Sequence, residues 1–128
     1  MFKKLLFLSC VFAVLAVVSP VVVAETPFAA TVTLGTNTGT GSYTNTRDYY
    51  AAQLVSLEVF QSLDLTSTCT VTRVRSTRTN TVAAIALTAG AGRYFETNTI
   101  YLFKGDVLNF ANSTATGAVV EITGKLHP

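Results

Sequence analysis

The residues of this chain that could act as an acid, a base or a nucleophile are few and far apart in the sequence. The only histidine, His127, is next to the terminal Pro128. A catalytic base must be held within hydrogen-bond reach of its partner, and a penultimate residue is expected to fray. Cys69 has threonines on both sides and no activating neighbour in the sequence. Neither a Ser-His-Asp nor a Cys-His site is therefore expected.

Carboxylates could support a second kind of chemistry, because a pair of them can hydrolyse a glycosidic bond. The candidates Asp48, Asp64 and Asp106 all fall in segments that we expect to be loops or turns, where aspartate is common for conformational reasons. The sequence contains no Asp-x-Asp-x-Asp-Gly run of the kind that forms a calcium loop. We therefore predict a protein that is not an enzyme and that holds no metal and no cofactor.

Three arginines, Arg73, Arg75 and Arg78, form the one local basic cluster. Arg73 and Arg75 are two residues apart, so on a strand their side chains share a face. The cluster is either a patch for phosphate or an acidic partner, or a solvated face whose charges pair with Glu58 and Asp64. We favour the solvated and paired face.

Residues 1–24 predict a secretory signal peptide. Two lysines near the start precede an apolar run from residue 5 to residue 18, and the segment ends in Val-Val-Val-Ala. Cleavage is expected after Ala24. The alternative is a retained membrane anchor, because the apolar run is nearly long enough to span a bilayer. Export would place the mature domain, residues 25–128, outside the cytoplasm, as a secreted, periplasmic or cell-surface protein.

Removal of this segment changes both the charge and the cysteine count. The chain has nine basic and seven acidic residues, but Lys3 and Lys4 leave with the signal peptide, so the mature domain is formally neutral. No global field is then expected to attract nucleic acid or anionic lipid. Cys10 leaves as well, and Cys69 remains alone. Cys69 is interpreted as a small buried residue or, alternatively, as one half of an intermolecular disulfide.

The mature domain is predicted to be organised around an antiparallel hairpin over residues 55–76. Apolar residues recur at alternate positions over 55–63, which is the period of a strand with one buried face. The second arm is rich in Thr and Val, and residues 64–67 supply the turn. This register places Leu57 opposite Val74 on the core face, and it places Glu58 opposite Arg73 on the other face.

The same register brings Phe60 and Val71 together on an otherwise polar face, with Cys69 close by. A contiguous apolar cluster on a small neutral domain often marks an interface. The alternative is that a second sheet or the loop over residues 35–46 covers these side chains within one monomer. The predicted contact surface consists of Phe60, Cys69, Val71, Arg73 and Arg75.

The remaining segments predict further short strands. They are residues 28–34, 81–88, 93–103, 107–110 and 118–123. Residues 81–88 are apolar on both faces, so we expect both to be covered. Lys104-Gly105-Asp106 predicts the turn of a second hairpin. Residues 35–46 and 111–117 are expected to be loops, 124–128 a tail, and 47–54 a lead-in to the central hairpin, or alternatively a short helix.

About seven strands with turns at short spacing, and no internal repeat, predict one all-β domain. The expected architecture is a single antiparallel β-sandwich of jelly-roll type. Two pieces of the sequence, Thr-Val-Thr-Arg-Val-Arg at 70–75 and Leu-Phe-Lys-Gly-Asp-Val-Leu at 102–108, resemble small accessory β-sandwich proteins of bacteriophage particles. That resemblance covers residues 50–123 and implies a virion accessory, decoration-type role without catalytic residues. The signal peptide departs from it, because virion parts assembled in the cytoplasm are not exported.

The function expected from these features is that of a non-catalytic exported β-sandwich with a structural, assembly or surface role. Its partner would be a second copy or another protein, not nucleic acid, and it would meet a membrane only through an uncleaved signal segment. The alternative is a secreted glycan- or protein-binding module that uses the loops 35–46 and 111–117. Five tyrosines could add a sugar-binding platform, although Trp is absent. They are Tyr43, Tyr49, Tyr50, Tyr94 and Tyr101.

Overall fold

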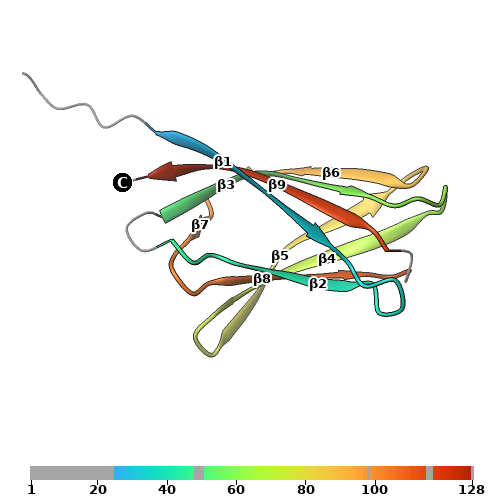
Figure 1. The fold of residues 1–128 in the computed structure, drawn as a ribbon, viewed down its shortest axis with the longest axis horizontal. Helices are drawn as coiled ribbons and strands as arrows, with labels where there is room; N and C mark the ends of the chain where they lie inside the picture. Colours follow the sequence, from blue (N-terminus) through green and yellow to red (C-terminus); the bar gives the residue numbers. More distant parts are fainter. Residues whose placement is uncertain (1–24, 48–50, 98, 115–116, 128) are drawn as a thin grey trace, which may run out of the picture.

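The structure is a computed structural model that describes residues 25–47, 51–97, 99–114 and 117–127. The predicted signal peptide and its cleavage site therefore lie outside the described residues. Within these ranges the chain forms nine strands, rather than about seven, in two antiparallel sheets packed as a sandwich (Figure 1). The strands are β1 (Thr26–Thr33), β2 (Thr40–Thr44), β3 (Ala51–Phe60), β4 (Ser67–Arg75), β5 (Arg78–Leu87), β6 (Ala91–Phe95), β7 (Tyr101–Leu102), β8 (Val107–Asn112) and β9 (Val119–His127).

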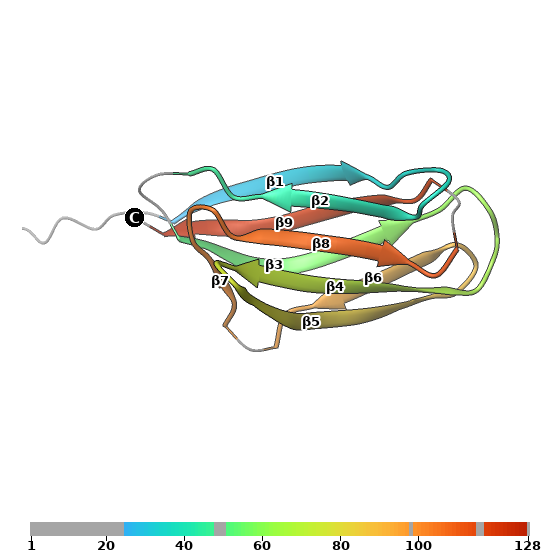
Figure 2. The same cartoon turned by 90° about the horizontal axis from the view of Figure 1, so that it is seen from below.

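Sheet A has the strand order β1-β9-β3-β6, with the short β7 also paired to β3, and sheet B has the order β2-β8-β4-β5. Most consecutive strands therefore lie in different sheets, and sheet A lies above sheet B in Figure 1, whereas in Figure 2 sheet B lies in front of sheet A. The inward faces of both sheets form one core, with Leu57 and Ile122 from sheet A and Val71 and Phe110 from sheet B fully buried. The predicted all-β sandwich is thus confirmed.

The predicted hairpin over residues 55–76 is wrong. Its first arm, β3, lies in sheet A, and its second arm, β4, lies in sheet B, so residues 61–66 cross from one sheet to the other. Glu58 lies opposite Arg93 on one side and Glu121 on the other. Arg73 lies opposite Asn80 and Leu108, so the predicted Glu58–Arg73 pairing does not form. Alternation sets which face of each strand is buried, but it does not choose the partner strand.

The hairpin that does form joins β4 to β5. Its register brings Arg75 opposite Arg78, which leaves only Ser76 and Thr77 in the turn. Ser76 has a positive φ of 54°, a conformation that two-residue hairpin turns require and that serine seldom adopts. Because Asn-Gly or Asp-Gly usually fills such a turn, the sequence carries no strong signal at this position.

Strand β3 contains a bulge that reverses its buried face. Leu54 lies opposite Gly124, whereas Ser56 lies opposite Thr123, so Val55 is an extra residue and its side chain is exposed. Before the bulge the even-numbered Leu54 is buried, and after it the odd-numbered Leu57 is buried. The predicted alternation from Val55 onwards therefore holds only beyond the bulge.

Other predicted strands are confirmed in position but not always in burial. Strand β1 covers all but the last residue of the segment predicted at 28–34, and β8 extends the one predicted at 107–110. Strand β5 covers all but the last residue of the segment predicted at 81–88, but only one of its faces is buried, because the outward Ala84 and Ala86 are exposed. Alanine is small enough to stand on either face, which is why this segment appeared apolar on both.

Three segments that were expected to be irregular contain strands. Strand β2 lies inside the predicted loop over residues 35–46, and β9 continues through most of the predicted tail. Strand β3 begins at Ala51, so no helix occupies residues 51–54, and residues 48–50 lie outside the described part. The turn at residues 104–106 forms, with Gly105 at a φ of 84°, but it joins β7 of sheet A to β8 of sheet B and is not a hairpin. Among the described residues, no helix has the length and apolar character to cross a bilayer.

Candidate functional site

An ion pair between Arg75 and Asp106 lies at one end of the sandwich. Arg75 Nε donates to both carboxylate oxygens, at 3.0 and 3.1 Å, and Nη2 donates to Oδ2 at 2.6 Å. The Asp106 side chain is only 3% exposed, and its Oδ2 also accepts from the Phe103 amide at 2.9 Å. Burial alone would raise the pKa of Asp106, but the hydrogen bonds from Arg75 and Phe103 outweigh it and hold the pKa below its ordinary value.

The buried Asn45 ties the chain together around this ion pair. Its Nδ2 donates to the Leu102 carbonyl at 2.8 Å, and its backbone N–H donates to the Asp106 carbonyl at 2.9 Å. Its own carbonyl accepts from the Gly105 amide at 2.8 Å. These bonds connect the end of β2 to the turn between β7 and β8. The ion pair therefore sits on a turn that is held at several points.

Arg73 points the same way as Arg75, as their spacing predicts. Both guanidinium groups reach the Tyr101 carbonyl, Arg75 Nη2 at 3.0 Å and Arg73 Nη1 at 3.5 Å. The buried Nε of Arg73 has no hydrogen-bond partner among the described residues. The Arg75 guanidinium stacks over the ring of the exposed Phe103, 4.3 Å from its centroid. Such a contact keeps an aromatic side chain at the surface beside a cation.

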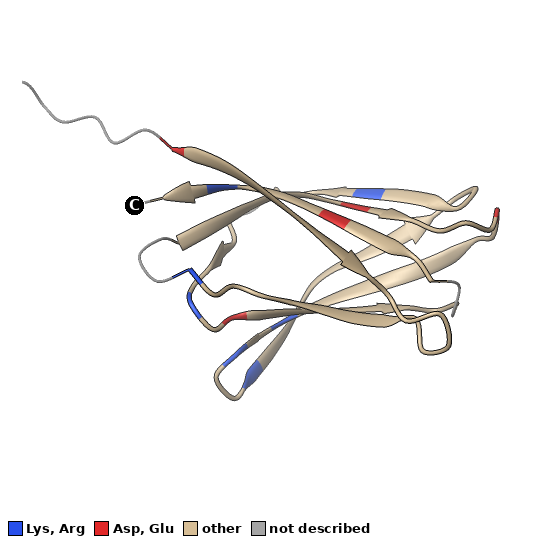
Figure 3. Cartoon of the chain, in the orientation of Figure 1, with Lys and Arg blue, Asp and Glu red and all other residues tan. Residues whose placement is uncertain are grey.

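The favoured pairing of these arginines with Glu58 and Asp64 is wrong. Glu58 forms its ion pair with Arg93 within sheet A, and Arg75 pairs with Asp106 instead. Figure 3 shows basic residues gathered at the end of the sandwich that carries the β4–β5 and β7–β8 turns. We call this surface the basic end; it comprises Arg47, Arg73, Arg75, Phe103, Lys104, Asp106 and Arg78. Most of the described carboxylates instead lie on or beside sheet A.

The opposite end of the long axis carries an apolar surface, formed where β3 crosses to β4 (Figures 1 and 2). The exposed fractions are 42% for Phe60, 51% for Leu63 and 46% for Leu65, with Asp64 between the two leucines. We call these four residues the apolar tip. Gln61 holds this connection in place, because its amide N–H donates to the Gly90 carbonyl at 2.8 Å and its Nε2 donates to the Leu65 carbonyl at 2.6 Å.

The predicted contact surface is not assembled as expected. Phe60 is exposed, but Cys69 and Val71 are fully buried in the core of sheet B, and Arg73 and Arg75 belong to the basic end. Phe60 and Val71 therefore do not lie side by side. Burial raises the pKa of the Cys69 thiol to about 11. The interpretation of Cys69 as a small buried residue is confirmed, and a buried thiol cannot reach a second chain for a disulfide.

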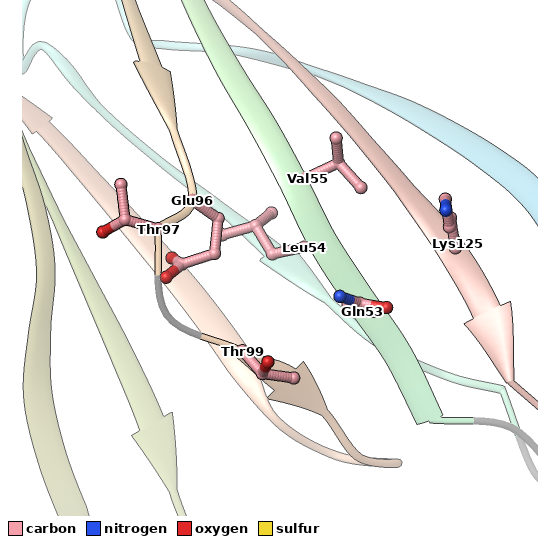
Figure 4. Close-up of a pocket in the computed structure, with 7 residues that line it drawn as sticks. All are labelled: Gln53, Leu54, Val55, Glu96, Thr97, Thr99 and Lys125. Atoms are coloured by element: carbon pink, nitrogen blue, oxygen red, sulfur yellow. The ribbon is translucent and has the colours of Figure 1, made fainter.

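A cavity of about 340 Å³ lies at the edge of sheet A, where its edge strand is interrupted (Figure 4). Strands β6 and β7 both pair with β3, and the edge is interrupted between the end of β6 at Phe95 and the start of β7 at Tyr101. The Glu96 amide donates to the Val55 carbonyl at 3.0 Å, and the Leu54 amide donates to the Ile100 carbonyl at 2.9 Å. The cavity is lined by Gln53, Leu54, Val55, Glu96, Thr97, Thr99 and Lys125.

Sequence reasoning missed the partner of Arg75, the apolar tip and the cavity. The apolar tip had a local signal, because Leu63 and Leu65 flank an aspartate in a segment assigned to a turn. The cavity had none, because it depends on how three strands meet. Within the described residues, no group of three or more His, Cys, Asp and Glu side chains could hold a metal ion. Comparisons with protein-family models, with curated proteins and with solved structures found no match for this chain.

Proposed function

We propose that this chain is an exported, non-catalytic β-sandwich of jelly-roll type that assembles end to end with copies of itself and acts in a structural or surface role. The observation that carries the proposal is the complementarity of the two ends. The apolar tip presents Phe60, Leu63 and Leu65 around the acidic Asp64. The basic end presents the exposed Phe103 beside arginines and Lys104.

The strand order supports the jelly-roll part of the proposal. A jelly roll has about eight strands in two sheets and is built from two Greek keys. If β6 and β7 count as one interrupted edge strand, the chain alternates between sheets in this manner, with β1-β9-β3-β6 facing β2-β8-β4-β5. The β4–β5 hairpin is then the connection that stays within one sheet. This order also brings the first and last strands side by side.

The relative sizes of the interactions assign a role to each part of the contact. Moving a large apolar side chain from water into a packed contact contributes up to about 1.5–3 kcal/mol. An exposed ion pair contributes less than about 1 kcal/mol. The apolar side chains of both ends would therefore supply most of the affinity, and Asp64 opposite the basic residues would set the orientation.

A contact between two different surfaces of the same chain is heterologous, so it closes into a ring or continues as a filament. Either product suits a protein that coats a surface. The signal peptide supports a secreted, periplasmic or cell-surface location, and the resemblance to virion accessory proteins extends the proposal to a particle surface. The proposal involves no nucleic acid, and membrane contact arises only if the signal segment is retained.

Sedimentation velocity of the mature chain over a range of concentrations tests the assembly. We expect oligomers that dissociate on dilution, of one discrete size if the contact closes into a ring and of many sizes if it continues as a filament. The double substitution Leu63→Ser and Leu65→Ser should abolish them without lowering the melting temperature, because both side chains are exposed. The matched control is Phe95→Ser, which removes an exposed aromatic residue that lies opposite Ser56 of β3 and belongs to neither end, and it should keep the oligomers. A wild-type chain that stays monomeric at all concentrations would overturn the proposal.

Charge exchange tests the orientation of the contact. Asp64→Lys and Lys104→Asp should each weaken assembly, whereas an equimolar mixture of the two variants should assemble through the restored pairing of one variant's tip with the other's basic end. Phe60→Ser should also lose the oligomer and keep its melting temperature. As a control, Phe110→Ala at the buried core should cost about 3–5 kcal/mol of stability. If Phe60→Ser lowered stability as much as Phe110→Ala, its side chain would be part of the core and not of a contact.

The cavity beside β3 favours a second candidate function, that of a secreted glycan-binding module. The loops first considered for that role are partly strands, since β2 lies within residues 35–46 and β8 reaches Asn112. Of the described tyrosines, Tyr43 and Tyr94 pack against the core, and Tyr101 is exposed. Tyr101 lies beside the cavity rather than on those loops.

A further inference from the structure

The cavity at the interrupted edge of sheet A is a built feature of the fold. Two deviations meet there, the bulge at Val55 in β3 and the interruption of the edge between the end of β6 and the start of β7. Two backbone hydrogen bonds fix the ends of the gap, one from the Glu96 amide to the Val55 carbonyl and one from the Leu54 amide to the Ile100 carbonyl. Bulges of this kind often lie beside functional sites, because they redirect side chains.

The polar groups that line the cavity include both donors and acceptors. A sugar hydroxyl is a donor and an acceptor at once, so a saccharide site must supply both. In Figure 4 these side chains come from three different segments, namely β3, β9 and the chain between β6 and β7. The polar lining residues are Gln53, Glu96, Thr97, Thr99 and Lys125.

Neighbouring residues hold two of these polar groups in place. Gln53 Oε1 lies 2.7 Å from His127 Nε2, so it accepts the imidazole proton, and the Gln53 amide keeps its two N–H donors. The hydroxyl of Tyr94 donates to Glu96 Oε2 at 3.0 Å. His127, which was expected to fray, is thus part of β9 and supports a cavity side chain. Preorganised groups of this kind lose little freedom when a ligand binds.

The charge of the cavity favours a neutral ligand. It has one carboxylate, Glu96, and one ammonium group, Lys125, and the ammonium group is already 3.2 Å from Glu25 Oε2. An anionic ligand such as a phosphate or a sulfated sugar would meet no excess positive charge here. Excess positive charge occurs at the basic end instead.

Two exposed aromatic residues of sheet A, Tyr101 and Phe95, are neighbours of residues that line the cavity. Tyr101 lies opposite Gln53, and Phe95 lies opposite Ser56, with exposed fractions of 37% and 59%. The Tyr101 ring also contacts the His127 ring edge-on, at 5.5 Å between centroids. Aromatic faces beside a polar cavity allow the apolar C–H face of a sugar ring to stack while its hydroxyls reach the polar groups.

From this arrangement we propose that the cavity binds one unit of a neutral saccharide, with Glu96, Thr97, Thr99 and Gln53 bonding its hydroxyls and Tyr101 stacking on its ring. The volume of about 340 Å³ is near the lower end for ligand cavities, which suits a single sugar unit better than a long chain. The proposal deepens the second candidate function and is independent of end-to-end assembly.

An array of immobilised neutral oligosaccharides, with sulfated and phosphorylated counterparts, tests this proposal. The Leu63→Ser, Leu65→Ser chain serves as the probe, so that the state of assembly does not affect the result. Saturable binding to one or more neutral glycans is expected. Binding restricted to the charged counterparts, or no saturable binding to any neutral glycan, would overturn the proposal while leaving end-to-end assembly untouched.

Substitutions then locate the site by isothermal titration with the neutral oligosaccharide that binds best. Glu96→Gln and Tyr101→Ala should each weaken binding about tenfold or more, and Thr97→Val combined with Thr99→Val should weaken it similarly. The matched controls are Glu121→Gln and Thr31→Val, which make the same changes on exposed positions of sheet A. Melting temperatures identify any variant that has lost its fold. Folded cavity variants that bind as the wild type does would show that the sugar site lies elsewhere.

Discussion

At the scale of single residues, Asp106 is the buried carboxylate on which the basic end depends. A buried charge is costly unless it is paired and hydrogen-bonded, and Asp106 meets both conditions through Arg75 and the Phe103 amide. Removing one partner of such a pair leaves the other uncompensated. Arg75 is partly exposed, so water would solvate its guanidinium group and reduce the cost of leaving that charge without a partner.

We expect Asp106→Asn to lower the free energy of unfolding by about 2 kcal/mol, because hydrogen bonds between charged groups are lost at a buried position. Chemical denaturation at pH 7 measures this change. The control is Glu121→Gln, an exposed carboxylate of β9, which should change stability by less than about 0.5 kcal/mol. Equal effects of the two substitutions would contradict the assigned role of Asp106.

The pH dependence of stability follows from the same residue. Its pKa is lowered in the folded state, so its contribution is complete above the unfolded value of about 3.9 and is lost as the pH falls through the lower folded value. Denaturation curves below pH 4 should therefore show a loss of stability in the wild type that is smaller in Asp106→Asn. If the wild type and Asp106→Asn lost stability equally over this pH range, the acid sensitivity would come from other groups.

At the scale of strands, the bulge of β3 depends on a glycine in its neighbour. Gly124 lies opposite Leu54, and a Cβ at this position would overlap the Phe28 ring and the Gln53 carbonyl oxygen. We expect Gly124→Ala to destabilise the protein by about 3 kcal/mol, as overpacked positions do. Thermal unfolding measures the loss, and Lys125→Ala, next along β9 and exposed, is the control.

A second substitution tests the reason for this loss. Phe28→Ala removes one of the two overlapping groups, but the Gln53 carbonyl belongs to the backbone and stays in place. The double variant should therefore remain at least as unstable as Gly124→Ala alone. Recovery of stability in the double variant would show that the aromatic ring, and not the backbone of β3, sets the requirement for glycine.

The strands could be predicted from the sequence to a large extent, but their partners could not. Alternating apolar residues fix which face of β1 or β8 is buried, because that information is local. The choice between a hairpin and a crossover after β3 depends on contacts far along the chain, and the turn-like residues 64–67 suggested the wrong answer. The turn that does form a hairpin, at Ser76 and Thr77, contains no glycine or asparagine that would mark it in the sequence.

The functional surfaces were predictable only where they depend on spacing within one strand. Arg73 and Arg75 share a face because they are two residues apart in β4. The buried partner of Arg75 is Asp106, which lies in a turn from another part of the chain. Aspartate is common in turns, so nothing in the sequence assigned Asp106 a further role. Val71 and Phe60 were joined by a register that does not exist, so their shared surface was wrong.

At the scale of the whole molecule, the predicted signal peptide leads to a prediction about processing. The exported protein should have the intact mass of a chain that begins at Glu25, because the small residues before this position suit cleavage after Ala24. Mass spectrometry of the secreted or periplasmic fraction measures this mass. Glu25 would then carry the new N-terminus close to Lys125 and His127. A chain that retains Met1 in the membrane fraction would overturn export in favour of an anchor.

The position of β9 determines when the protein can fold. The last strand of the chain lies between β1 and β3 in sheet A, and it pairs Thr26 with Leu126 across almost the whole mature domain. Contacts this distant in sequence form slowly, and here β1 has no partner in sheet A, and β3 lacks one of its two neighbouring strands, until β9 has been synthesised. A chain that is threaded through a membrane from its N-terminus therefore cannot complete sheet A on the near side before its passage is over. If the predicted signal peptide directs export, this strand order would delay completion of sheet A until the chain has crossed the membrane.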